Sequence, residues 1–195
     1  MAVKTGERKD QILQSLAEML ENPAGEKVTT AALAARLGVS EAALYRHFKG
    51  KAEMFDGLIE FIEHALFGLV NKITGEEKSG VRQVESIIAV LLAFAQKNGG
   101  MTRVLIGDAL VNEDVRLQTR INQLHERLEA ALKQALRFGV SQNEIAQDVD
   151  IAAHANLLMS FVIGRWHLFV KSGFKRDPAE LWAKQWRLLM EGVIA

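Results

Sequence analysis

The chain has 195 residues, of which 49% are hydrophobic, and its 24 basic side chains balance 24 acidic ones. This composition predicts a globular protein and excludes a disordered or fibrous one. The absence of cysteine excludes disulfides, thiolate metal sites and cysteine nucleophiles, and we expect neither a metal nor another cofactor. The polar segment Met1–Asp10 is unlike a signal peptide, and the longest uncharged run, residues 151–164, is too short to cross a bilayer. We therefore expect a cytoplasmic protein with no membrane partner.

Apolar residues at helical spacing predict an all-α protein without strands. Thr29 and Ser40 are the expected N-caps of the second and third helices, and Asp177-Pro178 is the expected start of the last. The helix at 81–97 is apolar on nearly every face, which predicts a central place in a bundle. In chain order, the expected helices span residues 8–21, 30–37, 41–47, 51–72, 81–97, 101–106, 112–138, 150–172 and 177–193.

The most informative segment is 30–44, where Ala34, Gly38 and Leu44 have the spacing of a helix-turn-helix. A small residue at Ala34 lets the two helices cross closely, Gly38 can adopt the positive φ of the turn, and Leu44 fills the angle between the helices. The second helix can then present its outer face to a major groove. The alternative is an ordinary helical hairpin with a glycine C-cap.

Local charge favours DNA binding over the plain hairpin. Residues 27–51 carry a net charge of +4 in a neutral chain, because the only carboxylate among them is that of Glu41. Cations that contact phosphates provide much of the affinity of proteins for DNA. The basic residues of this segment are Lys27, Arg36, Arg46, Lys49 and Lys51.

The string TTAALAARLGVSEAALYRHFKGKAEMF, residues 29–55, resembles the helix-turn-helix of the TetR family of bacterial regulators, and Leu44–Phe48 with Lys51 is its most specific part. The resemblance implies a TetR-like fold, with a three-helix DNA-binding domain at 1–51 and a helical dimerisation and partner-binding domain at 52–195. It implies phosphate contacts from Thr29, Thr30, Tyr45, His47 and Lys51, and base contacts from Ser40, Glu41, Ala42, Ala43 and Arg46. Partial burial at a helix end is the alternative for Tyr45, and Leu44 and Phe48 are expected in the core.

Other strings are similar to the branch of this family that acts in nucleoid occlusion: RKDQILQSLAEMLE, MFDGLIEFIEHAL, KNGGMTRVLIGDALVNEDVRLQTRINQLHERLEAALKQ and FVKSGFKRDPAELW. This resemblance covers most of the chain. It implies a homodimer that binds palindromic double-stranded DNA and, while on DNA, binds the division protein FtsZ and inhibits its assembly over the chromosome. It also implies association with the nucleoid and no small-molecule inducer.

On the helix at 51–72, Phe61 lies roughly 120° from the centre of the apolar stripe. Met54, Ala65 and Gly68 fall near it, so a small apolar patch is expected off the core face. Contact with a neighbouring helix or a second subunit would explain this patch. The resemblance instead implies a groove for the C-terminal tail of FtsZ, formed by Phe61, Val90, Ala93, Lys97 and Asn98. Leu69 stands where the branch would have a basic residue, which leaves the charge of that groove open.

The last two predicted helices carry more large apolar side chains than one chain of this size would easily cover. This predicts a two-fold helical interface, and plain core packing is the alternative. A dimer would also place two reading helices about 34–36 Å apart, one turn of DNA. The expected interface residues are Leu158, Phe161, Val162, Trp166, Phe169, Trp182 and Trp186.

No motif supports catalysis. The sequence His125-Glu126-Arg127-Leu128-Glu129 ends in Glu where a zinc protease requires a second His. Asp150 and His154, four residues apart, are more simply a helix-start acid and a core histidine than metal ligands. We therefore expect no enzymatic activity and no metal site.

Three functions remain compatible with the sequence. The first is a DNA-activated division antagonist. The second is a ligand-responsive TetR-type repressor, which would need a large cavity with a few convergent polar groups, and the dense apolar filling of the helix at 81–97 disfavours it. The third is an interaction protein that has lost DNA binding, against which the intact Thr29, Tyr45 and Lys51 argue.

Overall fold

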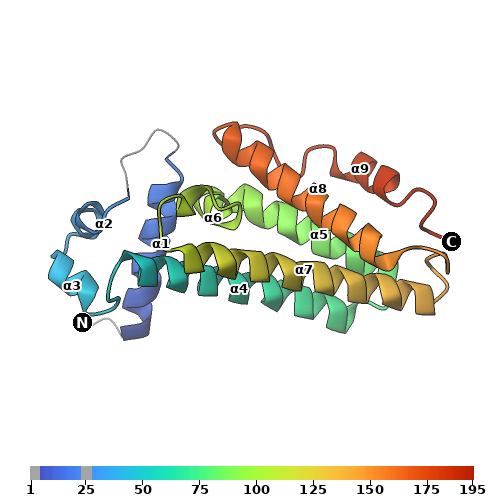
Figure 1. Cartoon of the computed structure of the whole chain (residues 1–195), viewed down its shortest axis with the longest axis horizontal. Helices are drawn as coiled ribbons and strands as arrows, with labels where there is room; N and C mark the ends of the chain where they lie inside the picture. Colours follow the sequence, from blue (N-terminus) through green and yellow to red (C-terminus); the bar gives the residue numbers. More distant parts are fainter. Residues whose placement is uncertain (1–4, 23–27) are drawn as a thin grey trace. The chain divides into compact units, whose positions relative to one another are not determined.

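The computed structural model describes residues 5–22 and 28–195, in which regular structure is helical apart from one isolated antiparallel bridge between Ile145 and Ile194 (Figure 1). Lys27 and the first four residues of the polar N-terminal segment lie outside the described residues. The all-α fold class is thus confirmed. The helices are α1 (Thr5–Leu20), α2 (Thr30–Leu37), α3 (Glu41–Tyr45), α4 (Lys51–Glu76), α5 (Gly80–Lys97), α6 (Gly99–Leu105), the 3-10 turn η1 (Asp108–Leu110), α7 (Val115–Ser141), α8 (Ile151–Lys171) and α9 (Trp182–Leu189).

The chain divides into two compact units, and α4 and α7 contribute to both. The first unit comprises the described residues up to Ile62 together with Asn98–Ile121, and the second comprises Glu63–Lys97 and Asn122–Ala195. This division differs from the boundary expected after residue 51, because α6 returns to pack against α1. None of the described helices is long and apolar enough to cross a membrane.

In the first unit, close contact between α1 and α6 depends on a glycine. A Cβ atom on Gly100 would lie 1.9 Å from the carbonyl oxygen of Ala17, a distance that real atoms cannot adopt. Gly99 and Gly100 begin α6, two residues before the start expected at residue 101. Arg103 of α6 also donates to the carbonyl of Leu20 at 3.1 Å and pairs with Asp108 at 2.7 Å.

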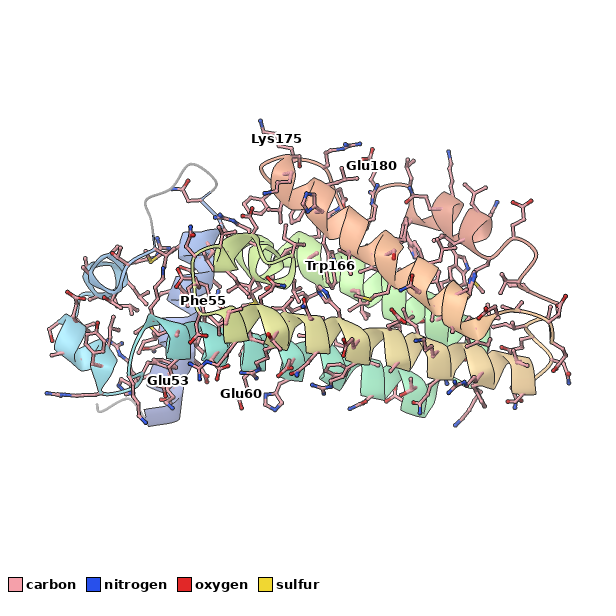
Figure 2. The ribbon with its side chains drawn as sticks, in the orientation of Figure 1. Glu53, Phe55, Glu60, Trp166, Lys175 and Glu180 are labelled. Atoms are coloured by element: carbon pink, nitrogen blue, oxygen red, sulfur yellow. The ribbon has the colours of Figure 1, made fainter. Side chains whose placement is uncertain are left out.

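In the second unit, α5 lies in the core and packs on α8. Its apolar side chains Val84, Ile87, Ile88, Leu91, Leu92 and Ala95 are fully buried, which confirms the central place predicted for this helix. Trp166 of α8, labelled in Figure 2, is also fully buried, and its indole N–H donates to the carbonyl of Leu91.

Several helix ends differ from the sequence-based expectation, and the structure explains three of them. Helix α4 continues past residue 72 to Glu76, where the buried Gln83 donates to the carbonyls of Thr74 and Glu77 and so satisfies the end of the helix. Helix α7 begins three residues late, after Asn112 at a φ of 68°. The Asp177-Pro178 start was wrong, because Leu181 takes a φ of 66° and α9 begins only at Trp182.

Candidate nucleic-acid interface

Helices α2 and α3 form the predicted helix-turn-helix. Gly38 has a φ of 64°, and its N–H and that of Val39 donate to the carbonyls of Ala35 and Ala34, which closes the end of α2. Ala34 and Leu44 are 3% and 1% exposed, so the small residue and the angle-filling residue occupy their predicted places. The spacing of Ala34, Gly38 and Leu44 in the sequence is therefore explained by the turn between the two helices.

Both predicted N-caps are confirmed. The hydroxyl of Thr29 accepts the N–H of Ala32 at 3.1 Å, and that of Ser40 accepts the N–H of Ala43 at 3.3 Å. Each bond satisfies an N–H at the start of a helix that has no partner within the helix. Helix α3 ends at Tyr45, two residues before the predicted end, and Arg46 is its C-cap.

The outward face of α3 is exposed and polar. Glu41, Ala42, Tyr45 and Arg46 are exposed, while Ala43 is half-buried. Tyr45, the last residue of α3, is 47% exposed, so it is partly covered at the helix end and still reaches solvent. The predicted base-contact residues thus surround the start and outer side of α3, with Ala43 the least accessible.

Thr30 joins the two helices through hydrogen bonds at this surface. Its hydroxyl donates to the Glu41 carboxylate at 2.6 Å and accepts from the Tyr45 hydroxyl at 3.5 Å. Thr30 and Tyr45, both predicted phosphate contacts, therefore already have partners within the chain. Leu44 and Phe48 are buried in the core beneath this surface, as predicted. His47 is half-buried, and its Nδ1 atom has no hydrogen-bond partner among the described residues.

Two of the cations counted in the local charge are neutralised within the chain. Arg36 pairs with Glu18 at 2.8 Å, and this bond holds the pKa of Glu18 below its ordinary value. Lys51 pairs with Glu113, a partner 62 residues away that no local sequence pattern could indicate. Arg46 and Lys49 are exposed and have no ion pair among the described residues.

The residues expected to bind a partner fall in both units. Phe61 is 41% exposed and Asn98 is half-buried in the first unit. Val90 and Ala93 are half-buried and Lys97 is exposed in the second. The expected membership of Met54 in an exposed patch was wrong, because its side chain is 1% exposed. Leu69, which stands where the branch would have a basic residue, is 42% exposed, and the neighbouring Val70 is buried.

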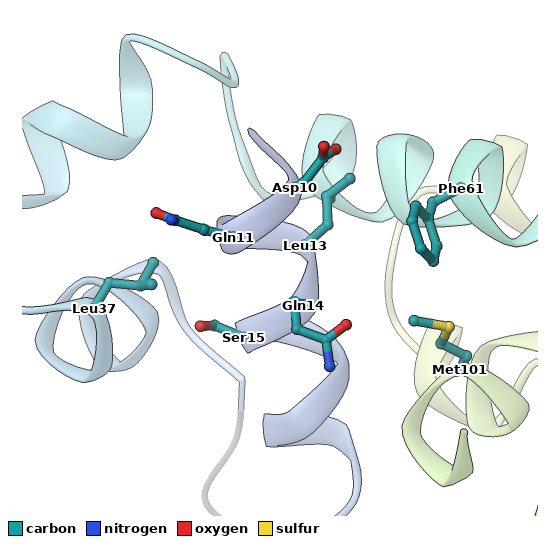
Figure 3. A pocket seen from close by; sticks show the side chains of 8 residues that line it. All are labelled: Asp10, Gln11, Leu13, Gln14, Ser15, Leu37, Phe61 and Met101. Carbon is teal, nitrogen blue, oxygen red and sulfur yellow. The ribbon is translucent and has the colours of Figure 1, made fainter. Parts of the chain in front are cut away.

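Phe61 also lines a pocket within the first unit. The pocket has a volume of about 440 Å³, and Figure 3 shows Phe61 of α4 and Met101 of α6 facing each other beside α1. Leu37 of α2 lies on the other side of α1 in the same view. The lining residues are Asp10, Gln11, Leu13, Gln14, Ser15, Leu37, Phe61 and Met101. The pocket therefore combines an exposed aromatic ring with side chains of α1 and with one residue of the helix-turn-helix, Leu37.

The reason given for the dimer interface was wrong. Leu158, Val162 and Trp166 are fully buried, and Phe169 and Trp186 are below 9% exposed, because α5 and the rest of the chain cover them. Only Phe161 and Trp182 are half-buried, and their rings contact each other at 6.0 Å. Core packing, the alternative, accounts for five of the seven residues. Leu157 and Leu168 of α8 and Leu188 of α9 are the exposed large apolar side chains of these helices.

The pair Asp150 and His154 has a structural explanation. Asp150 caps α8 by accepting the N–H groups of Ala152 and Ala153, each at 3.0 Å. Burial lowers the pKa of His154, and its Nε2 lies 3.4 Å from the sulfur of Met190. The described residues hold no group of three side chains that could bind a metal.

Comparison with known proteins identifies both parts of the chain. Residues 12–58 match the family "Bacterial regulatory proteins, tetR family", and residues 78–193 match "Tetracyclin repressor-like, C-terminal domain" of the SlmA-like type. A protein of Alteromonas mediterranea called "Nucleoid occlusion factor SlmA" is 50% identical over 95% of each chain. The protein of the same name from Idiomarina loihiensis is 47% identical over the whole of both chains.

Solved structures show the same fold. A TetR transcription regulator from Haloarcula marismortui matches with a TM-score of 0.82 at 15% identity, over 97% of this chain and 100% of that one. A TetR-family regulator from Agrobacterium tumefaciens matches with a TM-score of 0.81 at 15% identity, over 98% and 100%. These relatives are regulatory proteins rather than enzymes. The chain belongs to the TetR family of bacterial regulators, in its SlmA branch.

Proposed function

We propose that the protein is a homodimeric, sequence-specific DNA-binding protein that acts as a nucleoid occlusion factor. On a palindromic chromosomal site, it binds the C-terminal tail of FtsZ and inhibits FtsZ assembly, so that division is blocked over the nucleoid. Its location follows from this activity: it is cytoplasmic and associated with the nucleoid.

The observation that carries the DNA-binding part is the exposed face of α3. Its first turn presents Ser40, Glu41 and Ala42, and Arg46 stands exposed at its end. Phosphate contacts from Thr29, Thr30, Tyr45, His47 and Lys51 would fix the position of this helix, and contacts of Arg46 and Glu41 with base edges would read the sequence. Near-full-length similarity to SlmA proteins supports the same assignment.

The observation that supports partner binding is the exposure of Phe61. An aromatic side chain that is 41% exposed beside an apolar pocket is a good anchor site for a bulky side chain of a peptide. The buried residues of α5 and Trp166 leave their part of the second unit filled, which favours a surface partner over a ligand enclosed there. We therefore propose that the FtsZ tail binds at Phe61, and Val90, Ala93, Lys97 and Asn98 are the further contacts that the family resemblance implies. We expect no small-molecule inducer.

The experiment that tests the proposal is co-sedimentation with FtsZ polymers, with and without a palindromic chromosomal fragment recovered by pull-down with this protein. We expect the DNA-bound protein to bind FtsZ and reduce its polymerisation. Phe61→Ala should abolish that effect and leave DNA binding intact. Val115→Ala, which truncates a more exposed apolar side chain in the same unit, should behave as the parent.

If FtsZ does not bind the protein either with or without the DNA fragment, the proposed division function is wrong. A ligand-gated repressor of the TetR type would then be the better account, since DNA binding would remain without this partner. If the protein recovers no palindromic fragment, the DNA-binding part is wrong as well.

A further inference from the structure

The pairing of Lys51 with Glu113 joins the first residue of α4 to the segment between η1 and α7. The side chains are 25% and 17% exposed, so water screens the pair only in part. Lys51 also lies over the ring of Phe55, with Nζ 5.6 Å from the ring centroid. The Lys51 ammonium group is therefore held against the protein by the Glu113 carboxylate and the face of the Phe55 ring.

Glu113 is placed for this contact by its own backbone. Its N–H donates to the carbonyl of Leu110 at 3.0 Å, and the preceding residue, Asn112, has a φ of 68°. A non-glycine residue in this left-handed conformation is uncommon and needs support from its surroundings. The turn thus directs the Glu113 carboxylate toward α4 rather than toward solvent.

The other charged groups nearby have partners of their own. Asp114 pairs with Arg116 at 2.6 Å, and Asp56 pairs with Arg120 at 2.5 Å. The carboxylate of Glu53 accepts the backbone N–H of Lys49. Glu113 is therefore the carboxylate that these contacts assign to Lys51.

We infer that Glu113 competes with a DNA phosphate for Lys51 and thereby lowers the affinity of the protein for DNA. The inference rests on the proposed function, in which Lys51 holds a phosphate. A phosphate at the Lys51 ammonium would meet the Glu113 carboxylate at short range, where like charges in a poorly screened site repel. Lys51 must therefore leave Glu113 before it can neutralise the phosphate fully.

The contact also has consequences beyond α4. Glu113 lies in the segment 98–121, which Arg103 ties to α1 and Arg120 ties to α4. When a phosphate replaces the Glu113 carboxylate at Lys51, one ion pair is lost between the DNA-contacting helices and the segment that carries Asn98 and Met101.

The test is a double-mutant cycle in DNA affinity, measured by fluorescence anisotropy on the recovered palindromic fragment. Glu113→Gln removes the charge and keeps the shape, and we expect about a tenfold gain in affinity, an effect typical of a close charge pair. Asp114→Asn is the matched control, since it removes the neighbouring carboxylate, whose partner Arg116 is on the same segment. It should raise affinity much less. In a Lys51→Met background, Glu113→Gln should gain no more than Asp114→Asn.

The inference is overturned if Glu113→Gln binds DNA no better than Asp114→Asn, or if it binds more weakly than the parent, since Glu113 would then position Lys51 instead of competing for it. It is also overturned if the gain persists in the Lys51→Met background. Failure of the proposed function looks different: the parent itself would not bind the palindrome, or Lys51→Met would bind it as well as the parent.

Discussion

Trp166 of α8 donates its indole N–H to the backbone carbonyl of Leu91 in α5, at 3.0 Å and out of contact with water. The ring also lies 6.0 Å from that of His125. A buried Trp N–H requires a partner, and here the partner is the backbone of the central helix. The large C-terminal aromatic residue is therefore part of the interior of its own chain.

Trp166→Phe removes this donor and part of the buried ring volume. We expect the free energy of unfolding to fall by about 1–3 kcal/mol, from the lost hydrogen bond and the space left behind. Urea denaturation followed by circular dichroism measures it. Trp182→Phe, the same change at a half-buried ring, should cost less than half as much. Equal losses in the two variants would show that the Leu91 contact contributes little.

Two glycines in helices should respond in opposite directions to the same substitution. Gly100→Ala places a methyl group against the Ala17 carbonyl, so α6 must move away from α1, and we expect clear destabilisation. Gly68→Ala in α4 meets no atom within 4 Å and should stabilise the protein by about 0.5–1 kcal/mol, because alanine favours the helix. Melting temperatures of the two variants test this. A stabilised Gly100→Ala would disprove the close approach of the two helices.

Glu41→Gln should change DNA specificity. The carboxylate can accept a hydrogen bond from the amino group of cytosine, and it repels phosphates wherever no cytosine is present. Removing its charge should raise affinity for random DNA and lower the free-energy difference between specific and random binding by about 1 kcal/mol or more, which lowers the ratio of the two affinities. Competition binding with the palindromic fragment and a scrambled one gives that ratio. An unchanged ratio would mean that Glu41 only supports Thr30.

We expect the dimer surface on the exposed face of α8. Leu157 is 51% exposed, and Leu168, eleven residues or about three turns later, lies on the same side of the helix. A charged residue in the middle of an apolar interface is strongly unfavourable, so Leu157→Glu should yield monomers in sedimentation analysis and weaken binding to the palindrome. Val115→Glu, at a more exposed apolar residue elsewhere, should leave the dimer intact. A dimeric Leu157→Glu would place the interface on another surface.

His154 should contribute to loss of stability in mild acid. Burial lowers the pKa of His154 in the folded protein below its ordinary value of 6.5. As pH falls through that value, the unfolded chain binds a proton that the folded chain resists, and unfolding is favoured. The drop in melting temperature from pH 7.5 to 5.5 should therefore be smaller in His154→Gln. His167→Gln, which changes an exposed histidine of the same helix, provides the comparison. An equal drop in His154→Gln and the parent would contradict the burial effect.

Local sequence patterns alone were enough to predict the helix-turn-helix. The caps Thr29 and Ser40, the turn at Gly38 and the angle-filling Leu44 act through neighbours fewer than a dozen residues away, so spacing reveals them. The apolar residues on nearly every face of α5 likewise indicated its burial, because such a helix has little surface suited to water. The helical repeat did not indicate that Leu69 is exposed while Val70 is buried, because a period gives the spacing of an apolar face and not which neighbouring elements cover it.

By itself, then, the sequence determined the all-helical fold class, the reading motif and the family resemblance, since each depends on short-range spacing or on strings of residues. Only the tertiary structure decided which contacts join distant segments. The pairing of Lys51 with Glu113, the return of α6 to α1 at Gly100, and the covering of Trp166 by α5 all span tens of residues. The type of a side chain determines what kind of partner it needs, whether an opposite charge or an apolar surface. The fold determines which residue that partner is.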